Sequence, residues 1–122
     1  MRAKNISVAI GILALISAAA LALSRSDVYY GNRRQYTNPA SVNARAVFTA
    51  IPAYREIIER NIDEGSALYL KKLEEANRIF NEAIVSFAES NGYDLICEEG
   101  ALDDAPLVTD QVVRLVRQMT GQ

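Results

Sequence analysis

The sequence has few side chains that could carry out chemistry, and it has no histidine, the commonest general base and metal ligand in proteins. Its one cysteine, Cys97, has no second thiol with which to form an internal disulfide or a thiolate metal cluster. A catalytic thiolate would also need a base to activate it. We therefore expect Cys97 to be a small buried apolar residue, the alternative being a crosslink between two subunits.

Carboxylates gather only near the C-terminal end, at Glu98, Glu99, Asp103 and Asp104. Oxygen ligands suit calcium, but this spacing matches no calcium-binding loop. No flanking residues build an apolar pocket that would raise the pKa of one carboxyl for acid catalysis. The glycines follow neither phosphate-binding pattern of nucleotide-binding proteins. The sequence thus predicts no catalytic residue, no metal site and no cofactor, and a protein that acts by binding rather than as an enzyme.

The first 24 residues predict a secretory signal peptide or a membrane anchor. Arg2 and Lys4 precede a run of 18 uncharged, mostly apolar residues, numbers 6–23. Ala18-Ala19-Ala20 and Ala20-Leu21-Ala22 fit a signal-peptidase site, and 18 residues also approach the length of a membrane-spanning helix. No cysteine follows directly, which excludes a lipoprotein anchor. Cleavage of this segment and its retention as an anchor both stay open. A buried core helix is the least favoured alternative, because a helix that is apolar on every face is too large for the core of so small a domain.

Charge restricts the partners of the remaining chain. Beyond residue 22 the sequence holds 11 Lys and Arg against 15 Asp and Glu, a net charge of −4. A mildly acidic domain is a poor candidate for nucleic acid and has no general attraction to anionic lipid. Arg2 and Lys4 favour a cytoplasmic N-terminus and an exported C-terminus, although Arg25, Arg33 and Arg34 act against this orientation.

Residues 25–40 lack apolar periodicity and contain turn-forming residues, so we expect a linker there. Its arginines lie among Tyr29, Tyr30 and Tyr36, and tyrosine is enriched at membrane interfaces. The segment is therefore either a solvated stalk or a membrane-interface segment.

Residues 41–122 predict an α+β domain. Alternation of apolar and polar residues over 41–50 indicates a half-buried strand, and Pro52 opens a helix that ends before Gly65. A long helix follows from about Ser66 to Asn91, where Gly92 can terminate it. Residues 93–98 predict a strand, residues 99–102 a short pairing strand, and Thr109 the cap of a last helix. The expected architecture is an N-terminal apolar helix, then a small two- to three-stranded sheet with a helical hairpin and a C-terminal helix.

The long helix carries an apolar seam whose residues recur at steps of three and four. The first helix is about half as long and covers only part of this seam, so we expect another surface, economically a second copy of the chain, to cover the rest. Intrachain packing is the alternative for most of the seam. The predicted partner-binding residues of the two helices are Tyr54, Ile58, Ile62, Tyr69, Leu73, Phe80 and Phe87.

Several short sequence segments within residues 41–118 resemble the Skp/OmpH family of periplasmic chaperones. They are Val42-Asn43 to Val47-Phe48, Ile51-Pro52-Ala53-Tyr54, Phe80 to Ile84, Phe87 to Glu89, Gly92 to Ile96, and Val108 to Leu115. The resemblance implies a trimer that joins through a β-rich body and holds unfolded outer-membrane proteins between helical hairpins. This chain differs from the family in its shorter hairpin and its acidic rather than basic charge.

The sequence thus favours an exported or membrane-anchored envelope protein in the periplasm or at the periplasmic face of the inner membrane. The preferred function is a Skp/OmpH-like holdase that binds unfolded envelope proteins. The alternative is a structural subunit of an envelope complex, held by an uncleaved segment 6–23.

Overall fold

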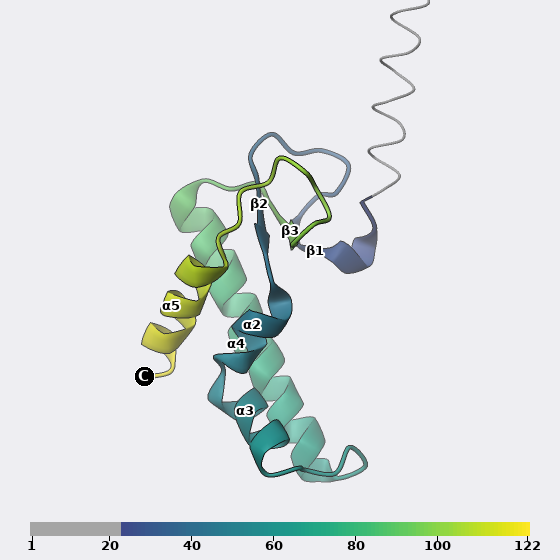
Figure 1. The fold of residues 1–122 in the computed structure, drawn as a ribbon, viewed down its shortest axis with the longest axis vertical. Coiled ribbons are helices and arrows are strands. Elements are labelled where there is room, and N and C mark those ends of the chain that lie inside the picture. Colours follow the sequence, from purple (N-terminus) through teal and green to yellow (C-terminus); the bar gives the residue numbers. More distant parts are fainter. Residues whose placement is uncertain (1–22) are drawn as a thin grey trace, which may run out of the picture.

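The computed structural model describes residues 23–122, which form an α+β domain with a small mixed sheet (Figure 1). The predicted N-terminal apolar helix lies outside the described residues. In chain order the elements are a 3-10 turn η1 (Arg25–Asp27), β1 (Val28–Gly31), β2 (Pro39–Val42), α2 (Ala44–Thr49), α3 (Pro52–Glu59), α4 (Ala67–Asn91), β3 (Leu95–Glu98) and α5 (Thr109–Met119).

The sheet has the strand order β1-β3-β2, with β3 in the centre. β1 pairs with β3 antiparallel and β2 pairs with β3 parallel. The predicted linker therefore contains an edge strand of the sheet instead of lying free. β1 is only four residues long and is flanked by turn-formers, so its Val-Tyr-Tyr sequence, although typical of strands, gave no periodic signal.

Gly31 is required where β1 ends. Its φ of 91° lies in the left-handed region, and a Cβ there would meet the backbone oxygen of Asp94 at 2.1 Å. Only glycine allows the two backbones to approach this closely.

Asp94 holds the loop between β1 and β2 against the start of β3. Its Oδ2 accepts hydrogen bonds from the backbone N–H of Thr37 at 2.6 Å and from the Thr37 hydroxyl at 3.0 Å, and its Oδ1 accepts from the Asn38 N–H at 2.8 Å. These backbone donors, that of Thr37 first, lower the pKa of the Asp94 carboxyl because they favour its charged form.

The expectation of a strand over 41–50 is wrong beyond Val42, because α2 begins at Ala44. Asn43 caps this helix, its side-chain oxygen accepting from the backbone N–H of Ala46 at 3.1 Å. Asn43 is a good N-cap, and the alanines that follow it favour helix. The apolar–polar alternation that predicted a strand depended partly on these same alanines, which are only weakly apolar, so the helix signal prevails.

The predicted ends of the long helix α4 are confirmed. The Ser66 hydroxyl caps α4 by accepting from the Tyr69 N–H at 3.1 Å, and Gly92 terminates it with a φ of 74°. The C-terminal elements differ in detail, since residues 99–102 form turns rather than a pairing strand. Val108, not Thr109, is the N-cap residue of α5, and the Thr109 hydroxyl instead accepts from the Asn43 N–H at 2.9 Å.

The main core lies between α4, the sheet and the helices α2, α3 and α5. Phe80 lies in it, stacked on Phe48 with ring centroids 4.4 Å apart and meeting Tyr29 edge-on at 5.3 Å. Phe87 stacks on Tyr93 at 5.9 Å. Phe80 is 4% exposed and Phe87 8%, so this half of the seam packs within the chain, not against a partner as we had expected.

Candidate binding site

The end of α3, the loop that follows it and the first turns of α4 form the tip of the helical hairpin. In Figure 1 this tip lies at the bottom, at the opposite end of α4 from the sheet. Asn61 has a φ of 48° in the left-handed region, which asparagine tolerates better than most residues. The loop is closed by hydrogen bonds from the Ile62 N–H to the Ile57 carbonyl at 3.1 Å and from the Ser66 hydroxyl to the Asp63 carbonyl at 2.7 Å.

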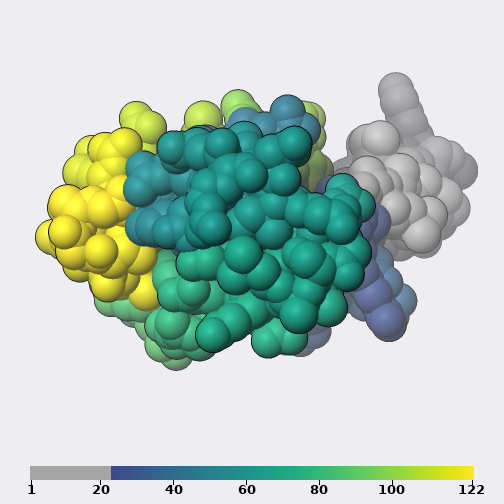
Figure 2. All heavy atoms as spheres, turned by 90° about the horizontal axis from the view of Figure 1, so that it is seen from below, coloured from purple at the N-terminus to yellow at the C-terminus, as the bar shows by residue number. Residues whose placement is uncertain are grey.

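A hollow of about 520 Å³ opens at this tip, and we call it the tip hollow. Its lining residues are Tyr54, Ile57, Ile58, Asn61, Ile62, Asp63, Glu64, Tyr69 and Leu73. Figure 2 views the molecule from this end, where the teal atoms of α3 and the start of α4 face the reader. Six of the nine are aliphatic or aromatic, and Asp63 and Glu64 add negative charge with no basic residue among them.

The tip hollow brings together five of the seven predicted partner-binding residues, Tyr54, Ile58, Ile62, Tyr69 and Leu73. The Ile58 side chain is 58% exposed, and the other four are half-buried. Burying such an isoleucine against a partner would remove apolar surface from water at a gain of about 25 cal/mol per Å². Phe80 and Phe87 lie in the core and take no part in this site.

The polar residues of the tip hollow were missed from the sequence. Asp63 and Glu64 stand in the loop, where charged residues are ordinarily only solvated, so nothing in their spacing distinguished them. Ile57 belongs to the same apolar face of α3 as its neighbours and could have been included on that ground.

The walls of the tip hollow are fixed to the rest of the domain. Lys72 on α4 forms an ion pair with Glu56 on α3, with Nζ and Oε2 2.5 Å apart. The hydrogen bond and charge of Lys72 lower the pKa of the Glu56 carboxyl. Tyr54 packs on Phe48 with ring centroids 5.4 Å apart, which joins the tip to the core. The ion pair thus holds α3 against α4, and the aromatic contact holds α3 against α2, with no partner bound.

The chemically reactive residues serve the fold. Cys97 is fully buried, its Sγ lies 3.6 Å from the Ala40 carbonyl oxygen, and burial raises the pKa of its thiol. This confirms the expected buried cysteine, since no thiol lies at the surface to crosslink subunits. Glu98 accepts from the Tyr29 hydroxyl at 2.7 Å and from the Ala44 N–H at 3.1 Å, so it joins β3 to β1 and α2. Burial, and then this bond to Glu98, raise the pKa of Tyr29.

Within residues 23–122, no helix has the length and apolar character needed to cross a membrane. No protein-family model, no curated protein and no solved structure matches this chain. The resemblance to the Skp/OmpH family therefore stays a prediction that rests on the short sequence segments given above.

Proposed function

We propose that this chain is an envelope protein that acts by binding, and that the tip hollow takes apolar segments of unfolded envelope proteins. The observation that carries this proposal is the clustering of Tyr54, Ile58, Ile62, Tyr69 and Leu73 around one opening. Ligand sites are typically concave, mostly apolar and about 300–1,000 Å³, with a few polar groups that orient the ligand. The tip hollow has this size, and six of its nine lining residues are aliphatic or aromatic.

The occupant that fits best is an extended stretch with one or two aliphatic or aromatic side chains beside a basic residue. The apolar walls would bury the former, and Asp63 and Glu64 would attract the latter. A site this small cannot enclose a whole client, so the chain would hold segments one at a time. Multiple copies, a trimer if the Skp/OmpH resemblance holds, would strengthen such binding by linking several weak contacts.

The position of the hairpin supports this role. α4 has 25 residues, about 37 Å at 1.5 Å per residue, and its two ends are the sheet and the tip. Figure 1 shows η1, where the described chain begins, beside the sheet and far from the tip. A chain held to a membrane by residues 6–23 would therefore present the tip hollow away from the bilayer.

The test is an aggregation assay in which an outer-membrane β-barrel protein, unfolded in urea, is diluted into buffer that contains the full chain in excess. Light scattering measures how far the chain suppresses aggregation. We expect suppression by the wild type and its loss in the Ile58→Asp variant, because the new charge would have to be desolvated against the client. Leu107→Asp is the matched control, since Leu107 is 53% exposed but lies outside the tip hollow. No suppression by the wild type, or equal loss in both variants, would remove the proposal.

A second candidate function is a structural subunit of an envelope complex, anchored by an uncleaved leader. The observation that favours it is Leu23, the last residue of the apolar run, whose side chain is fully buried against Leu95 and Cys97. With no spacer between the run and the fold, cleavage after Ala22 would place a new ammonium group next to this core. An intact, carbonate-resistant chain would favour the anchored subunit, and a mature N-terminus at Leu23 would contradict it.

A further inference from the structure

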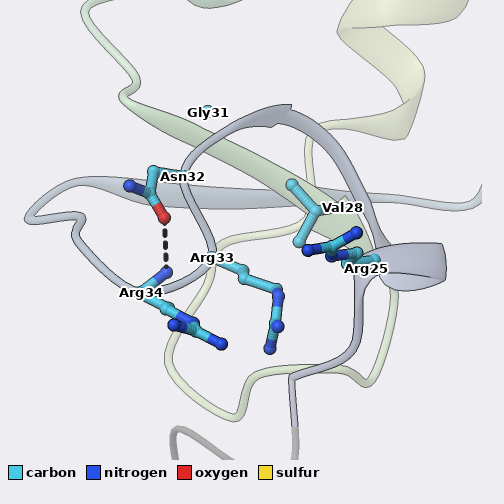
Figure 3. Close-up of a pocket in the computed structure, with 6 residues that line it drawn as sticks. All are labelled: Arg25, Val28, Gly31, Asn32, Arg33 and Arg34. Atoms are coloured by element: carbon cyan, nitrogen blue, oxygen red, sulfur yellow. Dashed lines mark hydrogen bonds between the residues drawn. The ribbon is translucent and has the colours of Figure 1, made fainter.

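A second hollow, of about 510 Å³, lies beside η1 and β1. Its lining residues are Arg25, Val28, Gly31, Asn32, Arg33 and Arg34. We call the three arginines the arginine collar. Figure 3 shows the Arg33 side chain between those of Arg34 and Arg25, with the guanidinium groups of Arg33 and Arg34 reaching to the same side of the loop.

A tight turn after β1 places Arg33 and Arg34 together. Asn32 forms an isolated antiparallel bridge with Gln35, whose N–H donates to the Asn32 carbonyl at 3.2 Å. The Asn32 side-chain oxygen also accepts from the backbone N–H of Arg34 at 2.9 Å, as the dashed line in Figure 3 marks. The turn is therefore held by its own backbone and by the Asn32 side chain, so neither arginine side chain is needed to hold it.

The arginine collar is a local positive patch on a domain of net charge −4. No carboxylate lines its hollow, and within residues 23–122 none of its guanidinium groups has a carboxylate oxygen within 4.0 Å. Asp27, the acid of the adjoining η1, accepts from the Ser24 hydroxyl at 2.9 Å. The planar fork of an arginine matches the oxygens of a phosphate group, and several arginines around one opening favour that ligand.

The arginine collar is fixed to the point where the apolar run ends. An Arg33 side-chain nitrogen, Nη1, donates to the backbone carbonyl of Leu23 at 3.3 Å. The Leu23 side chain is fully buried in the domain, so the collar and the end of the run cannot separate while the domain stays folded. If residues 6–23 span a bilayer, Leu23 would lie at the membrane surface with the domain, and the arginine collar would lie at the depth of the lipid headgroups.

We propose that the arginine collar binds the phosphate group of anionic phospholipid at the membrane surface, and so sets the domain flush against the bilayer. The inference rests on the proposed membrane attachment through residues 6–23, and it is independent of the role of the tip hollow. It also gives a reason for arginines that the positive-inside rule disfavours on the exported side. The acidic domain as a whole would not attract such lipids, so the attraction must come from these three residues.

The test counts lipids retained by the full chain in native mass spectrometry, after purification in neutral detergent doped with phosphatidylglycerol or phosphatidylcholine. The informative variant is Arg25→Gln/Arg34→Gln, which keeps the bond from Arg33 to Leu23. Arg45→Gln/Arg114→Gln is the matched control, because it removes the same charge from exposed positions outside the hollow. Each cation near an anionic surface contributes roughly a fivefold factor in affinity. Because the collar variant removes two cations, we expect its affinity for phosphatidylglycerol to fall about 30-fold.

Preferential retention of phosphatidylglycerol by the wild type and the control, with that loss in the collar variant, supports the proposal. Equal retention of both lipids, or equal loss in both variants, overturns it. Inorganic phosphate provides the other arm: if a few millimolar displaces the lipid completely, the site takes free phosphate and the lipid assignment is wrong. The Ile58→Asp variant should retain lipid like the wild type, which separates this result from any failure of the tip hollow.

Discussion

Replacing Phe80 distinguishes a core residue from an interface residue. Its ring is 4% exposed and contacts Phe48 at 4.4 Å and Tyr29 at 5.3 Å between centroids. Truncating a buried phenylalanine to alanine costs about 3–5 kcal/mol. Because single domains are stable by only about 5–15 kcal/mol, Phe80→Ala should remove a large part of the total. Phe80→Leu keeps most of the volume and loses two aromatic pairs at about 0.5–1.5 kcal/mol each, so about 1–3 kcal/mol.

The assay is thermal unfolding of the full chain in mild neutral detergent, at two protein concentrations. For a domain of this size about 1 kcal/mol shifts Tm by roughly 4–8 °C, so Phe80→Leu should lower Tm by about 4–24 °C at both concentrations. Leu107→Ala, at a site 53% exposed, is the control and should change stability by less than about 0.5 kcal/mol. A Phe80→Leu protein with unchanged Tm, but with an oligomer that dissociates on dilution, would refute the core assignment.

Two further predictions concern the contact between β1 and β3. Gly31→Ala should unfold at markedly lower temperature, by at least about 1–3 kcal/mol in stability, because its Cβ would overlap the Asp94 oxygen at a left-handed φ; an unchanged Tm would contradict this. Asp94→Asn should also lose stability, because an amide replaces one acceptor of the Thr37 and Asn38 N–H groups with a donor. The folded pKa of Asp94 is lowered, so its contribution is full above the unfolded pKa of about 3.9 and disappears as pH falls through the folded value. The Tm difference between wild type and Asp94→Asn should therefore be constant from pH 7 to about 5 and shrink below about pH 4, and a difference that persists at pH 2 would contradict the role of the charge.

The long helix could be predicted because several signals agree there. Its seam repeats from Tyr69 to Phe87, Ser66 caps its start and Gly92 ends it, and the structure has the same bounds to within a residue. The short elements could not be predicted, because β1 has four residues and α2 six. A four-residue strand shows at most two residues per face, and its pairing depends on β3, which lies more than sixty positions away in the chain.

The candidate site was predicted in part, for a related reason. Helical spacing shows which residues share a face of α4, but not where along its length the rest of the chain will cover that face. The seam divides near Ala76: from there to Phe87 it is buried by the chain itself, whereas Tyr69 and Leu73 border the tip hollow. The packing of α2 and α5, which is long-range in sequence, decides this division.

The most direct measurement of the central claim uses the absence of tryptophan from this chain. A single Ile58→Trp substitution places a fluorescent reporter at the mouth of the tip hollow, and Leu107→Trp places one at a comparably exposed site elsewhere. The ligand is a tryptophan-free synthetic peptide with two leucines beside an arginine. We predict a saturable blue shift for the Ile58→Trp variant on titration, and no shift for Leu107→Trp. An unshifted spectrum at position 58, or the same shift at both positions, would contradict the assignment of the tip hollow as a binding site.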